Sequence, residues 1–411
     1  MDKRVLSLAL ASFATGTETH VYAGHLAALA EALDVPIARA GQLAAAFAVT
    51  YALAAPPIAG AVAALDRRRL ILAGLVALGA LNLAAMAAPS FGALLAVRVL
   101  CGLAACLVGP IAAAAAAALV PPEHRGRAMA AVLAGLTLSF VFGIPLGSVA
   151  GEWFGWRATF GFSWVLALVA AAAIAAVLPP VPGGERAGPR ALLVAFDPAV
   201  RGSLLLTVLG FVASFSVVAY IGPVVTRVSG LTGSGVGAVQ AMIGAGGIVG
   251  VLVGGRFADR PGAGRMLAVS FAVSAAALGA YAALMLHPGP DPAARTAPLA
   301  LVTAASAAAL FSRTPVIQAR LVAAAPDARA VVLALNGSMI FLGQGLGAAV
   351  GGAAVAVSGL EATGLVGAAV ALLGAALALR GPGRAGSTSP AGAAPGAPLA
   401  SHPRAGRGPR P

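Results

Sequence analysis

Long apolar runs recur along the chain, separated by short breaks that carry charges, proline or glycine. Each run reaches about 20 residues, the length that an α-helix needs to cross about 30 Å of hydrocarbon. The runs are continuously apolar rather than alternating, so helices are favoured over the strands of a membrane β-barrel. We predict twelve transmembrane helices, near residues 5–30, 40–64, 70–88, 91–119, 129–151, 158–179, 202–226, 236–257, 265–286, 297–319, 331–357 and 361–379.

The composition agrees with a polytopic membrane protein. Of the 411 residues 60% are apolar and 9% are charged, whereas a soluble domain carries about 25% charged residues. This excludes an ordinary soluble enzyme, a disordered scaffold and a secreted disulfide domain. The net charge of +13 would suggest nucleic acid in a soluble protein, but the basic residues stand in short clusters between apolar runs, so we expect no nucleic-acid partner. Cys101 and Cys106 lie inside one run and fit neither a CxxC motif nor a zinc site.

The basic residues predict the topology. If the amino terminus is cytoplasmic, the inside segments hold 20 basic residues and the outside segments hold four, Arg39, Arg157, Arg227 and Arg295. Because positively charged loops stay on the cytoplasmic side, both termini are expected inside. Lys3 is the sole lysine, which is typical of a GC-rich bacterial genome. We therefore expect a multi-pass protein of the bacterial plasma membrane, acting as a monomer in the lipid bilayer.

A polar segment divides the chain into two halves. We predict an N-terminal six-helix bundle over residues 1–180, a cytoplasmic linker over 181–201 and a C-terminal six-helix bundle over 202–380. Residues 381–411 consist of Gly, Pro, Ala, Ser and Arg without periodicity. Such a segment cannot bury enough apolar surface to fold, so we expect a disordered cytoplasmic tail.

Small residues recur at every fourth position in three of the predicted helices. This spacing puts them on one helix face, where two backbones can approach closely; a chain this rich in Ala and Gly could also produce such stripes by chance. The stripes are Gly135, Ser139, Gly143, Gly147 and Gly151 in the fifth helix, Gly246, Gly250 and Gly254 in the eighth, and Gly343, Gly347 and Gly351 in the eleventh.

Several motifs, in their order along the chain, resemble the major facilitator superfamily, and within it the drug:proton antiporter branch with its arabinose-, sugar- and purine-efflux-like members. The turn after the eighth helix, Gly255-Arg256-Phe257-Ala258-Asp259-Arg260, is similar to the family's motif there. The matching turn of the first half keeps Asp66 and three arginines, but Val62 stands where the pattern has Gly. Further similar segments are Thr17-Glu18 with Gly24, Arg98-Val99-Leu100-Cys101-Gly102, Gly143-Ile144-Pro145-Leu146-Gly147 followed by Gly155-Trp156-Arg157, and Asn336 to Gly352.

The resemblance implies an all-α fold of twelve transmembrane helices in two six-helix bundles, with a central cavity and alternating access. By the same resemblance Asp66, Arg67, Asp259 and Arg260 belong to gate clamps, in which a carboxylate pairs with a helix N-terminus or a basic residue across the molecule. They also read as ordinary loop charges. Gly143, Pro145 and Gly147 are expected at contacts that slide as the two bundles rock.

Glu18 is the acidic residue that lies deep inside a predicted span. A charge at the centre of a bilayer costs several kcal/mol, and residues of this kind are usually functional. A carboxyl group at this depth suits the loading and release of a proton; the alternative is a protonated, hydrogen-bonded structural glutamate. Arg98, within the fourth helix, stays charged at any accessible pH. It could hold the Glu18 carboxylate in its ionised form, or its head could reach the headgroups instead.

Four polar residues are candidates for the wall of a substrate cavity. Tyr22 and His25 follow Glu18 at i+4 and i+7, so a continuous helix would put the three on one face. Gln240 and Asn336 lie within the eighth and eleventh helices and could bond the substrate or only a neighbouring helix. For an apolar part of the wall, the candidates are Tyr51, Phe140, Phe142 and Tyr220.

No sequence motif supports an enzyme, a metal site or a cofactor. The chain has no GxxxxGK[ST] phosphate loop, HExxH or GxSxG motif, and the five histidines do not cluster. The sequence therefore favours a secondary transporter that exchanges protons for a small organic molecule, such as a drug, nucleoside or sugar, and exports it. Two alternatives stay open: uptake or exchange without protons, and a membrane sensor or membrane-embedded enzyme that transports nothing.

Overall fold

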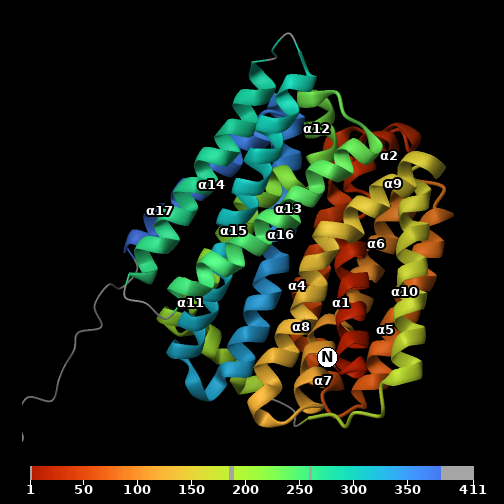
Figure 1. The fold of residues 1–411 in the computed structure, drawn as a ribbon, viewed down its shortest axis with the longest axis vertical. Helices are drawn as coiled ribbons and strands as arrows, with labels where there is room; N and C mark the ends of the chain where they lie inside the picture. Colours follow the sequence, from red (N-terminus) through yellow and green to blue (C-terminus); the bar gives the residue numbers. More distant parts are fainter. Residues whose placement is uncertain (1, 185–188, 259–261, 288, 290, 381–411) are drawn as a thin grey trace, which may run out of the picture.

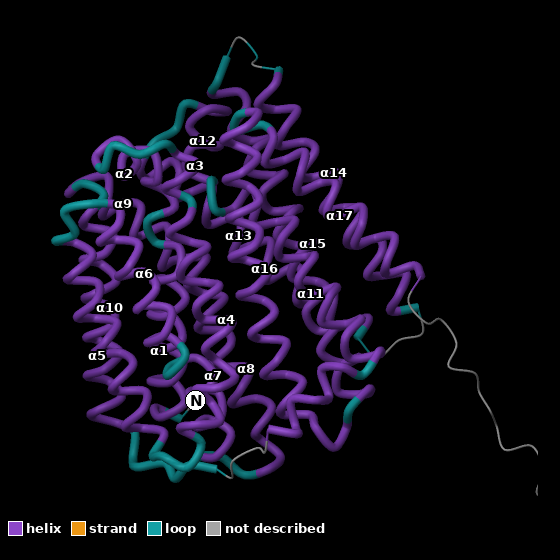
Figure 2. Tube along the Cα trace, turned by 180° about the vertical axis from the view of Figure 1, so that it is seen from behind, coloured by secondary structure: helices purple, strands orange, loops and turns teal. Residues whose placement is uncertain are grey.

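A computed structural model of the chain describes residues 2–184, 189–258, 262–287, 289 and 291–380. Within these ranges the chain is almost entirely helical and contains no strand (Figures 1 and 2). The predicted tail, residues 381–411, lies outside the described residues, and so do Asp259 and Arg260.

The first bundle holds the helices before residue 180, several of them interrupted by a short 3₁₀ or π turn. It consists of α1 (Lys3–His20), η1 (Ala23–His25), α2 (Leu26–Ala32), α3 (Ile37–Ala40), α4 (Gln42–Val62), α5 (Arg67–Met86), α6 (Phe91–Ala105), α7 (Gly109–Ala118), η2 (Pro122–His124), α8 (Arg125–Leu138), η3 (Ser139–Gly143), α9 (Ile144–Phe154) and α10 (Arg157–Val177).

The second bundle follows a short 3₁₀ segment, η4 (Pro189–Phe196). It consists of α11 (Pro198–Val218), α12 (Ile221–Ser229), α13 (Gly233–Phe257), α14 (Ala263–Leu286), η5 (Ala293–Arg295), α15 (Thr296–Ala324), η6 (Pro326–Ala328), α16 (Arg329–Ser358) and α17 (Ala362–Arg380).

Twelve helical segments cross the long dimension of the molecule. Eleven of them, counted over the described residues, are apolar and long enough to span a membrane. The twelfth is α1, which carries Lys3, Arg4 and Glu18 and is continued by η1 and α2. The prediction of an all-α protein with twelve helices in two bundles is confirmed.

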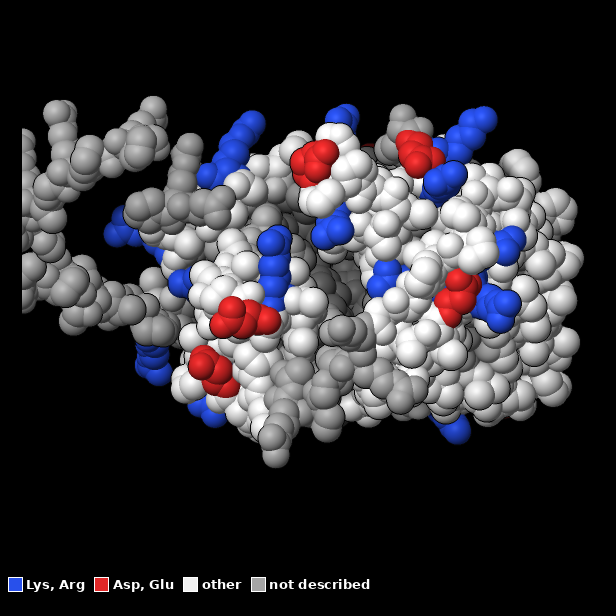
Figure 3. Space-filling view, turned by 90° about the horizontal axis from the view of Figure 1, so that it is seen from below, with Lys and Arg blue, Asp and Glu red and all other residues white. Residues whose placement is uncertain are grey.

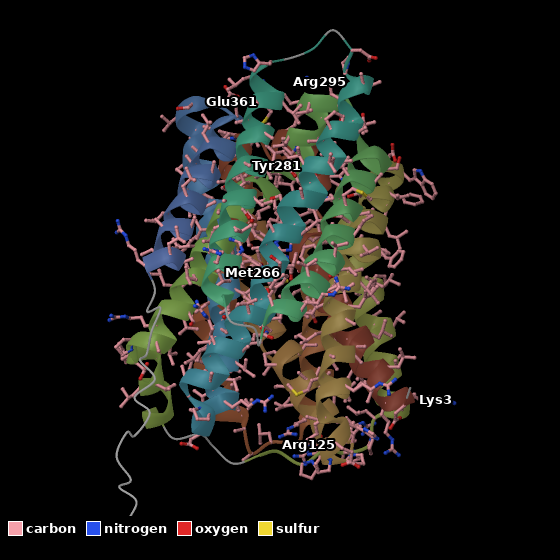
Figure 4. The ribbon with its side chains drawn as sticks, turned by 60° about the vertical axis from the view of Figure 1, so that its left-hand side comes forward. Lys3, Arg125, Met266, Tyr281, Arg295 and Glu361 are labelled. Carbon is pink, nitrogen blue, oxygen red and sulfur yellow. The ribbon has the colours of Figure 1, made fainter. Side chains whose placement is uncertain are left out.

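The two ends of the bundles differ in charge. Lys3 and Arg125 lie at one end, and Arg295 and Glu361 lie at the other (Figure 4). We call the first of these the basic end, because Arg67 and Arg125 begin helices there, and the other the opposite end.

The first predicted helix is broken where the sequence suggests continuity. α1 ends at His20, and the chain passes through the 3₁₀ turn η1 before α2 begins at Leu26. The last carbonyl groups of a helix lack partners within it, and here the Arg98 guanidinium donates to those of Glu18 and Thr19, at 3.4 and 3.1 Å. The prediction that His25 continues the helical face of Glu18 is therefore wrong.

The glycine stripes pack helices of the same bundle together. A Cβ atom at Gly135, Gly143 or Gly147 would collide with α1 or with Val21 just beyond it. In the second bundle, Gly343 and Gly347 meet α11 in the same way. This corrects the expectation that Gly143 and Gly147 lie at contacts between the bundles. Pro145 does face the other bundle, since its carbonyl oxygen would lie 3.0 Å from a Cβ atom at Gly237.

We predict that Gly250→Ala lowers the thermal unfolding temperature of the detergent-solubilised protein. The new Cβ would overlap the Ala308 carbonyl oxygen on α15, and overpacking costs about 1–3 kcal/mol. Gly279→Ala is the matched control: it lies mid-helix in α14 with nothing within 4 Å of a Cβ. It should raise the unfolding temperature slightly, because alanine favours helices by about 0.5–1 kcal/mol over glycine. Equal shifts in both variants would contradict the assignment of close packing to Gly250.

Candidate functional site

A buried ion pair joins the first and fourth transmembrane helices. Arg98 Nη1 on α6 donates to Glu18 Oε1 on α1, and their side chains are 0% and 3% exposed. The guanidinium also stacks on two rings, 4.9 Å from the centroid of Tyr22 and 4.6 Å from that of Phe47. Arg98 thus serves at once as the counter-ion of Glu18 and as a cap for the end of α1, where the helix dipole favours a cation.

The second oxygen of the Glu18 carboxyl group has no hydrogen-bond partner among the described residues. Asn82, Cys101 and Ser163 surround this carboxyl group, and the side-chain oxygens of Asn82 and Ser163 are also without a partner. The Ser163 hydroxyl and the Cys101 thiol each carry a hydrogen atom and can donate to the ionised carboxylate, whereas the Asn82 oxygen can only accept. A protonated Glu18 could donate to Asn82, so the surroundings offer a partner to either form of the carboxyl group.

Aromatic rings pack around the ion pair. The Tyr22 ring stacks on Phe160, with centroids 5.7 Å apart, and both side chains are buried. Tyr22 therefore lies over the ion pair, while its hydroxyl group has no partner in the described structure. His25 lies further on, where a Cβ atom at Gly151 would meet its ring.

The surface between the two bundles is hollowed at the basic end (Figure 3). At the middle and the opposite end the bundles touch. There α13 packs on η3 and α9, α16 packs on α4 and α3, and α12 packs on α2 and η1. The molecule is therefore open between its bundles toward the basic end and closed toward the opposite end.

Glu152 fastens the closed end. Its Oε2 atom accepts a hydrogen bond of 2.7 Å from the backbone N–H of Ser234, in the first turn of α13. A carboxylate at a helix N-terminus is stabilised by the free N–H groups and by the helix dipole. We expected this type of clamp at the basic end, from Asp66 and Asp259. Glu152 was not among the predicted site residues, although an acidic residue at the end of a predicted span was a usable signal.

Gln240 also joins the bundles near the closed end. Ser148 Oγ on α9 donates to its Oε1 atom at 2.7 Å, and Gln240 is buried. Tyr220 lies in the same region, with its hydroxyl 3.5 Å from the Ala38 carbonyl of the first bundle and 3.0 Å from that of Ala348. Gln240 and Tyr220 thus lie at the contact between the bundles.

Asp66 and Arg67 cap helices within the first bundle. The Asp66 carboxylate accepts from the backbone N–H of Arg69 at the start of α5, and Arg67 Nη1 donates to the Ala114 carbonyl of α7 at 3.0 Å. In this open state no hydrogen bond or ion pair joins either residue to the described part of the second bundle. Their predicted gate partners, Asp259 and Arg260, lie outside the described residues.

Two neighbouring cavities lie largely within the second bundle. Cavity 1 is lined by Leu206, Thr207, Gly210, Phe211, Leu310, Arg313, Thr314, Ile317, Asn336 and Ile340. Cavity 2 is lined by Phe140, Ser214, Phe215, Val218, Ile243, Tyr281, Thr303, Ser306, Ala307, Leu310 and Phe311. Figure 4 locates Tyr281 within the second bundle. Leu310 borders both cavities, and Phe140 brings the first bundle into cavity 2.

The four predicted cavity residues are separated by the structure. Asn336 lines cavity 1 and its Oδ1 atom accepts from Thr207 at 2.7 Å. The other three line neither cavity. Tyr22 lies over the ion pair, His25 lies against α9, and Gln240 lies between the bundles. Of the apolar candidates, Phe140 lines cavity 2, whereas Phe142 is 54% exposed. No group of His, Cys, Asp or Glu in the described part of the chain could hold a metal ion.

The comparison with protein families agrees with this arrangement. A family model described as the Major Facilitator Superfamily matches residues 7–312. The chain belongs to the major facilitator superfamily. It is therefore a multi-pass membrane transporter of a small molecule and not an enzyme.

A curated relative has a drug-resistance name. The chain is 36% identical over 261 residues to the "Chloramphenicol resistance protein" of Streptomyces lividans. The match covers 62% of this chain and 66% of that protein, just under two thirds of its length.

Solved structures share the fold. A bacterial homologue of the human lysosomal transporter Spinster, in an inward-facing and occupied conformation, has a TM-score of 0.74 at 17% identity and covers 92% of this chain and 95% of its own. A D-xylose-proton symporter has a TM-score of 0.70 at 17% identity, with 92% and 96% covered. At this identity the likeness concerns the fold alone.

We predict that Glu152→Gln opens the end fastened by Ser234. The neutral amide oxygen is a weaker acceptor than a carboxylate. Spin labels at Phe154→Cys and Thr232→Cys, with Cys101 and Cys106 replaced by alanine, should report a longer mean distance. Glu123→Gln, an exposed residue of η2, is the control and should leave the distance unchanged. An unchanged distance in Glu152→Gln would show that the clamp does not hold the closed state.

Loss of either partner of the ion pair should lower the stability of the protein, but by different amounts. Removing one partner of a buried pair costs about 3–5 kcal/mol. Glu18→Gln strands a guanidinium that cannot lose its charge, whereas Arg98→Gln leaves a carboxyl group that can take up a proton. We therefore expect the unfolding temperature of Glu18→Gln to fall further than that of Arg98→Gln. The double variant should regain most of the loss, and additive losses would contradict the pairing.

Proposed function

We propose that the protein is a proton-coupled antiporter that exports a small organic molecule. The buried Glu18–Arg98 pair carries the proposal, because Glu18 is the buried acidic residue of the described chain. A proton on Glu18 would weaken its bond to Arg98 and allow Glu18 to donate to the free oxygen of Asn82. Return of the proton to water would restore the ion pair.

The asymmetry of the ends supports a direction for this cycle. Basic residues gather at the end that is open between the bundles, and the positive-inside rule makes that end cytoplasmic. In the state described here a substrate would therefore enter from the cytoplasm. Opening of the Glu152–Ser234 clamp and closure of the basic end would release it outside, as alternating access requires.

A drug is the first substrate class to test. The relative from Streptomyces lividans is named for chloramphenicol resistance, and the cavity walls here are largely apolar and aromatic. We propose that the protein works as a monomer in the bacterial plasma membrane, with both termini in the cytoplasm.

We predict that Glu18→Gln abolishes chloramphenicol transport driven by a pH gradient in proteoliposomes. The amide cannot carry a proton, so the gradient would have no group to act on. Exchange of labelled for unlabelled drug at equal pH should persist. The Glu18→Gln/Arg98→Gln double variant serves as a second test, because it leaves no unpaired charge at this buried site that would destabilise the protein.

Glu123→Gln should transport as the unaltered protein does. Gradient-driven transport that is unchanged in Glu18→Gln would remove Glu18 from the mechanism and favour a facilitator that does not use protons. If neither gradient-driven transport nor exchange is measured in the unaltered protein, chloramphenicol is not a substrate.

A further inference from the structure

Cavity 1 contains a buried arginine that lacks a carboxylate partner. Arg313 on α15 is 2% exposed, and only its Nη2 group is bonded, donating to Ser274 Oγ at 2.8 Å. Its Nε and Nη1 groups have no partner in the described structure. The described residues form two ion pairs, Arg98–Glu18 and Arg227–Glu361, and Arg313 takes part in neither.

The surroundings of Arg313 hold it in place without neutralising it. Its guanidinium lies 4.0 Å from the centroid of the Phe271 ring. On the neighbouring helix α11, a Cβ atom at Gly210 would lie 3.1 Å from the Nη1 atom of Arg313. The glycine therefore leaves room for the guanidinium beside α11. A buried cation is costly unless it is paired, and arginine keeps its charge.

Further polar groups line the same cavity. Thr207 and Asn336, which bond each other, and Thr314 line cavity 1 together with Arg313. The neighbouring cavity 2 is walled by Phe140, Phe215, Tyr281 and Phe311. The hydroxyl group of Ser214 in cavity 2 is buried and has no partner in the described structure.

Cavities 1 and 2 each enclose about 10 Å³, so the side chains around them must move apart to admit a ligand. We propose that this region binds an organic anion, with its carboxylate at Arg313 and its apolar ring body among the aromatic side chains of cavity 2. Arginine recognises carboxylates through charge-assisted hydrogen bonds, and the free Nε and Nη1 groups supply the donors. This inference rests on the proposed transport function and names the chemical class of the substrate.

The test compares three probes that share one body: 4-phenylbutyrate, its amide and 4-phenylbutylamine. Each is titrated into the purified protein without a proton gradient, and affinity is measured by calorimetry and by the shift in unfolding temperature. The carboxylate should bind about tenfold or more tightly than the amide. A difference of this size corresponds to the free energy of about one charge-assisted hydrogen bond. The amine should bind most weakly.

Arg313→Gln should remove the preference for the carboxylate and leave amide binding within about twofold. Without a ligand, Arg313→Gln should unfold at the same or a higher temperature, because the variant buries one unpaired charge fewer. Arg320→Gln, on the same helix and outside both cavities, is the control and should keep the preference. Arg313→Lys should retain part of it, since lysine keeps the charge but loses the planar fork.

Equal binding of carboxylate and amide, or no binding of the carboxylate, would overturn the proposal. So would a carboxylate preference that survives in Arg313→Gln. Glu18→Gln separates this inference from proton coupling. This variant should lose the response to a pH gradient and keep the preference for the carboxylate. Conversely, transport of neutral drugs with no anion preference would support antiport and reject the anion site.

Discussion

The ion pair between Glu18 and Arg98 is the interaction on which the first bundle depends. Charged groups inside a bilayer are tolerated when they face the bundle interior and are paired. Here Arg98 neutralises Glu18, bonds the last carbonyls of α1 and stacks on Tyr22 and Phe47. One guanidinium thus fixes the end of the first helix, its break into η1 and its contact with the fourth helix. The chemistry proposed for Glu18 and the shape of the bundle have the same source.

Glycines bring helix backbones into close contact both within the bundles and between them. Within the first bundle, Gly135 lies against the backbone of α1. Between the bundles, Gly222 on α12 lies against the backbone of η1, and Gly345 on α16 lies against that of α4. At the opposite end the Glu152 carboxylate adds a hydrogen bond to Ser234. Opening of this end must therefore separate packed backbones as well as break this bond.

The sequence was sufficient for the fold and for the ion-pair residues, because both follow from rules that act along a helix. Run length predicts the spans, and a lone acid within a span predicts a buried function. The contacts between helices were not accessible in the same way. A stripe of small residues shows that a helix is approached closely but does not say by which helix, so Gly143 and Gly147 were assigned to the wrong interface. The break after His20 likewise depends on Arg98, a residue 78 positions away along the chain.

A contact route connects the two parts of the proposed cycle. His20 stands two residues after Glu18 at the end of α1, and its ring lies 5.9 Å from that of Phe140 and 5.2 Å from that of Phe215. Both phenylalanines line cavity 2, one from each bundle. Protonation of Glu18 would weaken the bonds between Arg98 and the end of α1. His20, at that end, would then be free to move. A molecule held between Phe140 and Phe215 would then meet a different wall in the protonated and ionised states. Such a difference is what coupling requires, because a proton can shift the equilibrium between two conformations only through its unequal affinity for them.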